Sequence, residues 1–274
     1  MTRIHNESVW TTVVIIQIED DITDELWQSI VKECVTYLHD VDRVFSPYRS
    51  DSYLNLLASN PDSLNIQDGP VQHNIFRHYE PFFGSTFTKS AVGAFETIES
   101  LCAAAQWKSN GAFNAWRNDS YDPIGLVKGW AADFVIEILK SYGITQAFVN
   151  AGGDIACMTL SEPWRIAIGN PSDNTTALGF LEISNGALCT SGTYEKGNHI
   201  QTRNNQSDFS SVTISGPSAA LADAYATAVI ADGLVAFEWL GALGADWGAI
   251  AISGDFSAIY THNWQLNDHQ FSQI

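Results

Sequence analysis

Basic residues are scarce in this chain. Its 274 residues include 13 lysines and arginines against 31 aspartates and glutamates, so the formal net charge is −18. The corresponding isoelectric point is about 4.5. Nucleic acids and anionic membrane surfaces attract proteins through a positive field, which this composition does not supply. We therefore expect no nucleic-acid partner, and we expect any anionic ligand to be held locally by backbone amides, a lysine or a metal ion.

Closely spaced cysteines are also missing. The four cysteines, Cys34, Cys102, Cys157 and Cys189, are far apart in mostly apolar contexts, and no Cys-X-X-Cys pair occurs. Zinc sites of the finger type and dithiol redox motifs depend on such spacing. We interpret these cysteines as reduced thiols of the core.

Targeting signals and long uncharged apolar runs are absent from the sequence as well. The segment 1–6 has no apolar signal core and no cysteine that could be acylated. No uncharged apolar run reaches the length of a membrane span. These observations predict a cytoplasmic location without membrane insertion.

The remaining pattern is that of one mixed α/β domain. Hydrophobic residues make up 45% of the chain, and the sequence has no evident linker, low-complexity segment or tandem repeat. Segments with strand and helix periodicity alternate, which favours an α/β (α+β mixed) fold with mixed sheets flanked by helices over residues 1–274. We expect strands over 10–18, 164–169, 211–215, 247–253 and 257–261, and a hairpin turning at Asn185–Gly186. Helices are expected after a cap at Asp21 or Thr23, after Lys89, Gly129 and Ser218, and near 234–243.

The segment 122–158 carries the clearest local pattern. Apolar residues recur at helical spacing after Gly129, and Gly143 stands where a helix C-cap favours positive φ. A short strand over Phe148–Val149 then ends at Gly152–Gly153, where the backbone could approach a ligand closely. Loops of this kind bind anions in many α/β proteins, and many others are ordinary turns.

Asp223 and Thr227 form a second candidate pair. Their i, i+4 spacing places a carboxylate and a hydroxyl on one face of a helix, between alanines. Oxygen ligands of this kind suit a hard cation such as Mg²⁺. The alternative is a carboxylate near a helix start, stabilised by the helix dipole, with the threonine bonded back to its own helix. Without other evidence the structural role is the favoured interpretation.

Three further features have two interpretations each. The Ser-Pro turn before Tyr48 and Arg49 could place an aromatic ring and a charge at a pocket rim, or it is an ordinary turn. The hydroxyl-rich segment 190–194 could bond phosphate oxygens or cap itself. His199 is a candidate catalyst, although a single histidine is more often an incidental residue.

Taken in order, these segments resemble the ApbE family, the FAD:protein FMN transferases. The resemblance covers most of the chain and rests on eight short segments in the family's order. They are Phe45-Ser-Pro-Tyr-Arg-Ser-Asp-Ser52, Gly111-Ala-Phe113, Asp122 through Lys128-Gly129 to Asp133, Val149-Asn-Ala-Gly-Gly-Asp-Ile155, Trp164-Arg-Ile-Ala-Ile168, Thr190-Ser-Gly-Thr-Tyr194, His199-Ile200 and Ala222-Asp-Ala-Tyr-Ala-Thr227.

The resemblance implies a single-domain ApbE-like fold and a flavin transferase activity. Similar proteins bind FAD in an open groove with Mg²⁺ at the pyrophosphate and transfer FMN to a threonine of a partner flavoprotein, releasing AMP. Some members hydrolyse FAD to FMN and AMP instead. The expected partners are therefore FAD and an acceptor flavoprotein.

Position by position, the resemblance assigns roles to particular residues. Asp223 and Thr227 look like metal ligands, joined by the backbone carbonyl of Val127. The expected catalytic residues are Asp223 and His199, which would lie near the reacting phosphate as a base for the acceptor hydroxyl. Lys128 is expected to help the metal hold a pyrophosphate in so acidic a protein. The positions that resemble FAD contacts are Trp10, Tyr48, Ala112, Phe113, Asn114, Ile124, Lys128, Trp130 and Ile200.

The sequence departs from the family pattern near the reacting centre. Members usually continue after His-Ile into Asp-Pro-X-Thr-Gly, whereas this chain has a shorter, different segment over 201–209. Trp10-Thr-Thr12 stands where Met-Gly-Thr is usual, Asn114 replaces an aspartate, and Ala226 stands where many relatives have a further acid. Three interpretations of the function remain. The protein is a Mg²⁺-dependent flavin transferase, an FAD pyrophosphatase with the same site, or a non-catalytic FAD-binding protein.

Overall fold

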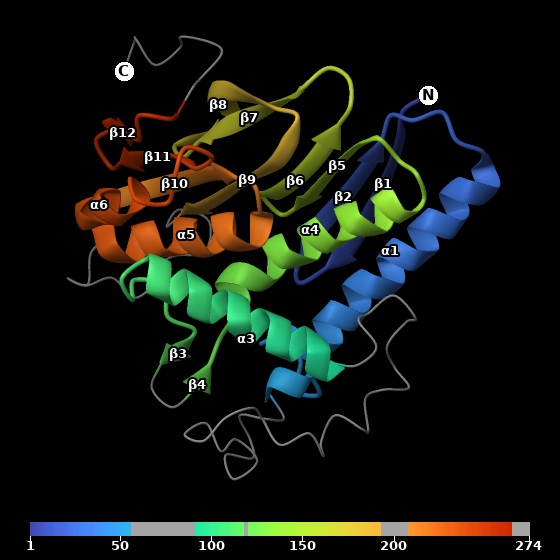
Figure 1. The fold of residues 1–274 in the computed structure, drawn as a ribbon, viewed down its shortest axis with the longest axis horizontal. Coiled ribbons are helices and arrows are strands. Elements are labelled where there is room, and N and C mark those ends of the chain that lie inside the picture. Colours follow the sequence, from blue (N-terminus) through green and yellow to red (C-terminus); the bar gives the residue numbers. More distant parts are fainter. Residues whose placement is uncertain (56–90, 118–119, 193–207, 265–274) are drawn as a thin grey trace.

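The computed structural model describes residues 1–55, 91–117, 120–192 and 208–264. Its central element is an eight-stranded sheet in the order β1-β2-β5-β6-β9-β10-β11-β12, with antiparallel pairing throughout (Figure 1). The strands span Arg3–Val9 (β1), Thr12–Ile18 (β2), Gln146–Ala151 (β5), Asp154–Thr159 (β6), Asn185–Gly192 (β9), Phe209–Gly216 (β10), Gly248–Ser253 (β11) and Ala258–Tyr260 (β12).

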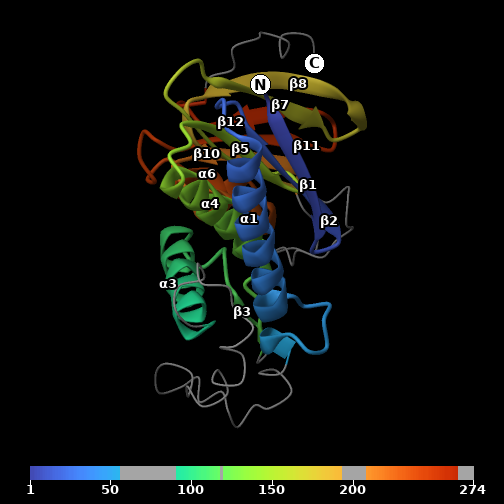
Figure 2. The same ribbon diagram turned by 90° about the vertical axis from the view of Figure 1, so that its right-hand side faces the viewer.

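Helices cover one face of this sheet, and a separate hairpin covers the other (Figure 2). The helices α1, α4 and α5 lie against the sheet, with α3 packed on α4 and α5. The helices span Asp24–Phe45 (α1), Ala91–Lys108 (α3), Ile124–Ser141 (α4), Ala219–Asp232 (α5), Gly233–Val235 (the 3₁₀ turn η4) and Ala236–Leu240 (α6). The covering hairpin is formed by Trp164–Asn170 (β7) and Asp173–Ile183 (β8). A further antiparallel pair is formed by Trp116–Arg117 (β3) and Ser120–Tyr121 (β4). The expected mixed α/β architecture is confirmed, whereas one domain over residues 1–274 stays a prediction.

The central strands are buried on both faces. In β9, Ala187 and Cys189 point toward the helices, whereas Leu188 between them packs under the β7–β8 hairpin. Because neither face meets water, such strands read as continuous apolar runs rather than as alternating ones. The four cysteines are buried and unbridged, as the sequence predicts.

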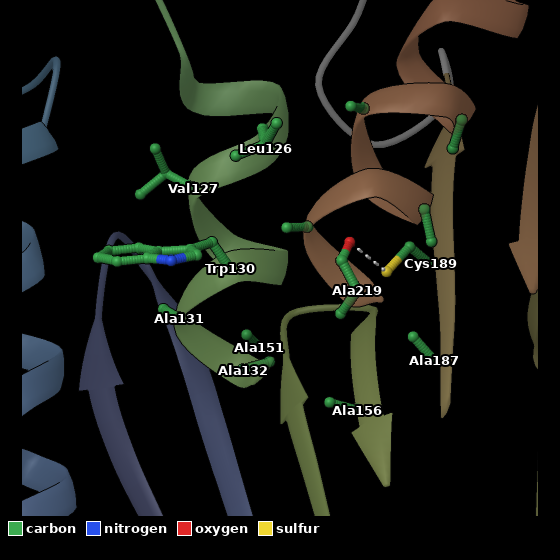
Figure 3. Packing of buried hydrophobic residues seen from close by; sticks show 14 of the residues in the cluster. Leu126, Val127, Trp130, Ala131, Ala132, Ala151, Ala156, Ala187, Cys189 and Ala219 are labelled. Carbon is green, nitrogen blue, oxygen red and sulfur yellow. Dashed lines mark hydrogen bonds between the residues drawn. The ribbon is translucent and has the colours of Figure 1, made fainter. Parts of the chain in front are cut away.

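The α4–α5 contact is unusually close because the facing residues are small. A Cβ added at Gly129 would lie 2.2 Å from the carbonyl oxygen of Ala219, so the two helix backbones nearly touch there. Figure 3 shows Ala219 at the start of α5, where its carbonyl accepts a hydrogen bond from the Cys189 Sγ at 3.4 Å. The contact leaves no space for a side chain at position 129.

The start of α5 is capped by two residues. Ser218 is its N-cap, and its hydroxyl accepts a hydrogen bond from the Leu221 amide, as the sequence predicts. Asp133 reaches across from α4 and accepts hydrogen bonds from the amides of Ala219 and Ala220 at 2.9 and 3.0 Å. The positive end of the α5 dipole is therefore neutralised by the chain's own carboxylate.

Two details of the predicted strands are wrong. The expected strand over 10–18 begins only at Thr12, because Trp10 and Thr11 have positive φ values of 55° and 60° and form the turn that follows β1. The strand β1 itself was not expected, since its sequence is mostly polar. It lies at the edge of the sheet, where exposed Ile4, Asn6 and Ser8 alternate with half-buried Arg3, His5 and Glu7.

The predicted hairpin at Asn185–Gly186 is also wrong. These residues begin β9, which pairs with β6 and β10, whereas β8 pairs with β7 in the covering hairpin. Gly186 is required there for a different reason than a tight turn. An added Cβ would lie 2.7 Å from the carbonyl oxygen of Gly216, so the glycine allows a close backbone approach.

One stretch of the described chain is long and apolar enough to cross a membrane. It is Ala219–Leu240, with a mean hydropathy of 1.5 over its most apolar window, of which 72% is buried inside the fold. A core helix passes the same test of length and composition, and α5 lies between the sheet and α3. The cytoplasmic location stays a prediction.

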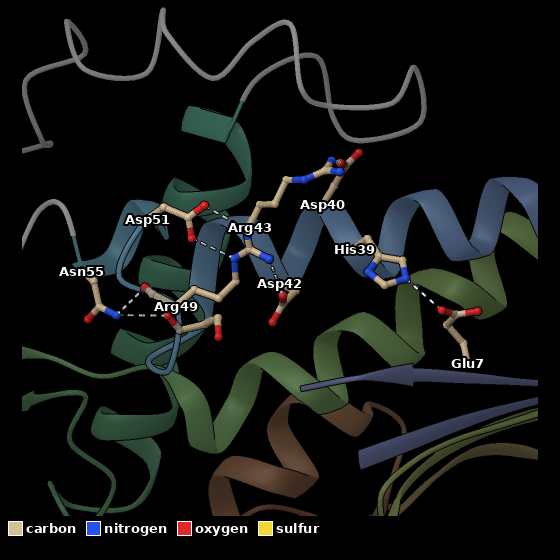
Figure 4. A network of polar contacts seen from close by, with 9 residues as sticks. Glu7, His39, Asp40, Asp42, Arg43, Arg49, Asp51 and Asn55 are labelled. Carbon is tan, nitrogen blue, oxygen red and sulfur yellow. Dashed lines mark hydrogen bonds and ion pairs between the residues drawn. The ribbon is translucent and has the colours of Figure 1, made fainter. Parts of the chain in front are cut away.

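The edge strand β1 is joined to α1 through Glu7. Its carboxylate accepts hydrogen bonds from His39 at 2.8 Å (Figure 4) and from His5 at 3.0 Å. Burial acts to raise the pKa of Glu7, but the bonds to His39 and His5 outweigh it and leave the pKa below its ordinary value of 4.5. A lowered carboxylate pKa contributes stability above the unfolded-state pKa, and this is lost as the pH falls through the folded-state pKa.

We expect Gly129→Ala to destabilise the fold. The methyl group would meet the Ala219 carbonyl, so α5 must shift, and overpacking of this kind costs about 1–3 kcal/mol. Denaturant unfolding followed by circular dichroism measures the loss. Gly254→Ala is the matched control, because its added Cβ meets no atom within 4 Å. Equal stability of the two variants would contradict the close contact.

We expect Glu7→Gln to make the free energy of unfolding depend less on pH in the acidic range. The wild-type free energy of unfolding should fall as the pH drops below about 4.5, whereas the variant should lose less over the same interval. Urea unfolding at a series of pH values measures both curves. Asp21→Asn, which removes a carboxylate 98% exposed to solvent, serves as the control. Parallel curves for wild type and Glu7→Gln would show that the contacts of Glu7 with the histidines do not contribute to the pH dependence of stability.

Candidate functional site

Two turns lie side by side at one end of the sheet. The β5–β6 turn contains Gly152 and Gly153, with positive φ values of 70° and 100°, as the glycine pair predicts. The β1–β2 turn lies beside it, since a Cβ added at Gly152 would lie 2.6 Å from the Thr12 hydroxyl. Trp10, the first predicted pocket residue, is half-buried in that turn. Gly152 is therefore packed against Thr12, whereas a Cβ added at Gly153 would meet no atom within 4 Å.

The first turn of α4 enters the same region. Asp122 accepts a hydrogen bond from the amide of Ile124 at 3.1 Å and so holds the start of the helix. Gly125 is not helical, with φ −74° and ψ 17°, and α4 bends there. A Cβ at Gly125 would lie 3.0 Å from the Thr227 hydroxyl. The bend brings the start of α4 against the middle of α5.

Lys128 forms a partly buried ion pair with Asp154. The ammonium contacts the Asp154 carboxylate, and the two side chains are 19% and 1% exposed. Burial acts to lower the pKa of Lys128, but the negative charges of Asp154 and Asp223 outweigh it, so the pKa is raised. Lys128 is therefore a fixed cation at neutral pH, and it lies within the influence of a second carboxylate.

That second carboxylate belongs to α5. Asp223 is 3% exposed, and Thr227 follows one turn later with its hydroxyl 3.3 Å from that of Ser191 on β9. Burial raises the pKa of the Cys189 thiol, and the charges of Asp154 and Asp223 raise it further. Asp154 lies opposite Cys189 in the sheet, and α5, the helix that carries Asp223, packs on β6 and β9.

The donor set suits a hard cation. Asp223 supplies a carboxylate, Thr227 and Ser191 supply hydroxyls, and the missing Cβ of Gly125 leaves space beside the Thr227 oxygen. Oxygen ligands with room for waters and phosphate are typical of Mg²⁺ sites. Within the described ranges, no group of three or more His, Cys, Asp or Glu side chains could hold a metal ion. A site here would therefore combine one carboxylate with neutral oxygens, including the carbonyl of buried Val127.

A second surface presents Tyr48. The side chain of Tyr48 is 71% exposed on a turn that follows α1. The turn is held from inside, because the Asn55 side-chain amide donates to the carbonyl oxygens of Pro47 and Arg49 at 2.9 and 2.7 Å (Figure 4). The Arg49 guanidinium donates in turn to Asp51 at 2.9 and 3.1 Å. These hydrogen bonds hold the turn that carries Tyr48, and its place at a pocket rim stays a prediction.

The predicted FAD contacts after α3 lie mostly in the core. Ala112 and Phe113 are 8% and 3% exposed, and the Phe113 amide donates to the Ser109 hydroxyl at 2.9 Å. Asn114 is half-buried and accepts a hydrogen bond from the Trp116 amide at 2.9 Å. The side chains of Ala112 and Phe113 therefore have little exposed surface, and the expected FAD contacts of this segment stay predictions.

Trp130 is placed mainly as a core residue. It is 8% exposed, and its ring packs with Tyr37, Phe45 and Phe134 between α1 and α4. Its expected contact with FAD stays a prediction.

The structure brings together part of the predicted set. Val127, Lys128, Asp223 and Thr227 share the α4–α5 junction, with half-buried Ile124 at its edge. Tyr48 lies on a separate turn. His199 and Ile200, and the segment 201–207, lie outside the described residues.

Sequence reasoning gave no role to Asp154 or to Gly125. Asp154 follows the glycine pair and opens a strand whose other residues are all buried, so a charged residue at that position was the available signal. Gly125 left a weaker signal, because a glycine near a helix start has several common explanations.

Comparison with known proteins points to one family. The family model described as "ApbE family" matches residues 84–247. A Vibrio cholerae protein named FAD:protein FMN transferase is 40% identical over 73 residues, which are 25% of this chain and 22% of that protein. A protein of the same name from Escherichia coli K12 is 30% identical over 129 residues, 41% of this chain and 37% of that protein. These matches span about a fifth to two fifths of the curated relatives.

Solved structures match over nearly the whole chain. The flavin transferase ApbE from Vibrio cholerae has a TM-score of 0.72 and 18% identity, covering 96% of this chain and 98% of that one. The ApbE protein from Thermotoga maritima has a TM-score of 0.75 and 17% identity, covering 96% and 97%. At these identities the likeness establishes the fold.

We expect the loss of Lys128 alone to lower the free energy of unfolding more than the loss of both charges of the Lys128–Asp154 pair. Lys128→Met leaves the Asp154 carboxylate buried without its cation, which typically costs about 3–5 kcal/mol. The double variant Lys128→Met/Asp154→Asn removes both charges and should recover most of that loss. Urea unfolding of both variants and wild type measures the difference. If Lys128→Met were as stable as the double variant, leaving the Asp154 carboxylate without its cation would cost no stability.

Proposed function

The chain belongs to the ApbE family, and we propose that it transfers the FMN part of FAD to a threonine of a partner flavoprotein, releasing AMP. The observation that carries this proposal is the junction of α4 and α5, where Lys128 and the oxygens of Asp223 and Thr227 lie near the turn that contains Gly152 and Gly153. Its partial relatives named FAD:protein FMN transferase support the same chemistry.

The charges of this junction suit a pyrophosphate. A protein of net charge −18 repels a dianion, so local cations are required. Lys128 supplies one of them. We propose that Val127, Asp223 and Thr227 hold Mg²⁺, which when bound would neutralise charge that develops on the phosphate oxygens. Lys128 then orients the pyrophosphate from the side of β6.

The flavin and adenine rings require apolar and aromatic surface. Tyr48 offers an exposed ring on a preformed turn, so little conformational entropy is lost when a planar ligand stacks on it. We propose further contacts from the remaining predicted positions, Trp10, Ala112, Phe113, Asn114, Ile124, Trp130 and Ile200.

The proposed reaction is a single displacement at phosphorus. The acceptor threonine oxygen forms a bond to the FMN phosphorus, and the bond from that phosphorus to the bridging oxygen breaks. AMP leaves with the bridging oxygen, and the threonine proton passes to a base, for which we propose His199. With water in place of threonine, the same displacement yields free FMN and AMP.

Incubation with FAD and Mg²⁺, with and without candidate acceptor flavoproteins, tests the function. Mass spectrometry of the acceptor should show a covalent FMN adduct, and AMP should appear in equal amount. AMP with free FMN, whatever acceptor is added, would identify a pyrophosphatase instead. FAD binding without AMP release would identify a non-catalytic FAD-binding protein. A His199→Ala sample should retain FAD affinity while turnover falls about 10²–10⁴-fold.

We expect Asp223→Asn to abolish Mg²⁺-dependent release of AMP, because the amide keeps the shape of the side chain but not its charge. Thr227→Ala should weaken the release less, since a neutral hydroxyl contributes less to cation binding. AMP release measured against Mg²⁺ concentration gives both effects. Asp21→Asn, an exposed acid, controls for net charge. Full Mg²⁺-stimulated activity in Asp223→Asn would falsify the metal assignment.

A further inference from the structure

Thr227 interrupts a long buried stretch of α5. Every other residue from 222 to 232 is buried, whereas Thr227 is half-buried. Gly125 of α4 faces it, because a Cβ added there would lie 3.0 Å from the Thr227 hydroxyl. The hydroxyl therefore lies at the α4–α5 junction, on a side chain that retains exposed surface.

A threonine inside a helix has a choice of hydrogen-bond acceptors. Its hydroxyl can bond the backbone carbonyl four residues earlier, which for Thr227 is that of Asp223, and helical threonines divide between two side-chain rotamers for this reason. In this structure the Thr227 hydroxyl lies 3.3 Å from the hydroxyl of Ser191 on β9, which is its hydrogen-bond partner among the described residues. A threonine bonded back to its own helix, the structural alternative that the sequence left open, is therefore not the conformation observed.

The sheet fixes the position of Ser191. Its backbone pairs with Val212 on β10, and α5 packs directly on β9 and β10. The Ser191 hydroxyl therefore offers Thr227 a hydrogen bond from one direction. This bond favours the rotamer whose oxygen points toward the sheet over the rotamer whose oxygen points back along the helix.

We propose that Ser191 is a positioning residue that selects the side-chain rotamer of Thr227 and so presents the Thr227 oxygen to a divalent cation. The inference rests on the metal role of Thr227 in the proposed function. It assigns Ser191 an effect on metal affinity that is exerted through Thr227.

Nuclear magnetic resonance of isotope-labelled protein tests the rotamer without metal or turnover. The three-bond couplings of the Thr227 methyl carbon to its backbone nitrogen and carbonyl carbon report χ1, and in wild type they should indicate one rotamer. Ser191→Ala removes the partner, so the couplings should move toward the average of two rotamers. Ser215→Ala is the matched control, because this half-buried serine lies opposite Leu188 and bonds the Gly248 carbonyl rather than α5.

Titration with Mn²⁺, with the free ion followed by electron paramagnetic resonance, tests the effect on the cation. Ser191→Ala should lower Mn²⁺ affinity about 10-fold, as is typical when the partner of a metal ligand is lost. Thr227→Val should lower it as well. The double variant should bind no more weakly than Thr227→Val, because Ser191 then has no hydroxyl left to orient. Circular dichroism checks that each variant is folded.

Three outcomes would overturn the inference itself. Unchanged Thr227 couplings in Ser191→Ala would show that Ser191 does not select the rotamer. Wild-type Mn²⁺ affinity in Ser191→Ala, with weaker binding in Thr227→Val, would show that the rotamer does not affect the cation. A double variant weaker than Thr227→Val by the full loss of Ser191→Ala would show that Ser191 binds the cation itself. A failure of the proposed function looks different, because Thr227→Val and Asp223→Asn would then bind Mn²⁺ as well as wild type.

Discussion

The contact of α4 with α5 at Gly129 determines both the packing and the site. Because the backbone of α4 nearly touches the Ala219 carbonyl, the residues on either side of Gly129 are brought against α5. Lys128 precedes this contact directly, and the bend at Gly125 meets Thr227 one turn earlier. A bulkier residue at 129 would separate the two helices. It would also move the oxygens of Asp223 and Thr227 on α5 away from the Lys128 ammonium on α4.

Local sequence patterns predicted the elements that build this contact. The apolar spacing after Gly129 indicated α4, Ser218 indicated the start of α5, and Gly143 has the positive φ expected of a helix end. The i, i+4 spacing of Asp223 and Thr227 placed both on one helix. Such features depend on residues a few positions apart, so the sequence contains them directly.

Long-range partners were not available from the sequence in the same way. Lys128 and Asp154 are 26 positions apart, and only the sheet and the helix packing make them neighbours. The strand β1 was missed because an edge strand needs few apolar residues, and Asn185–Gly186 suggested a turn although a close backbone approach requires the glycine. The resemblance to a family supplied the expected metal-ligand role of Val127, and it favoured that role for Thr227, which residue chemistry alone had left open.

The cap that Asp133 forms on α5 limits the sources of positive charge for a phosphate ligand. Many phosphate sites use the positive end of a helix, but here that end already holds a carboxylate from the chain itself. Positive charge for a phosphate ligand must then come partly from solution, as a dissolved ion. On the proposed chemistry, occupancy by the flavin nucleotide would follow the concentration of free divalent cation around the protein.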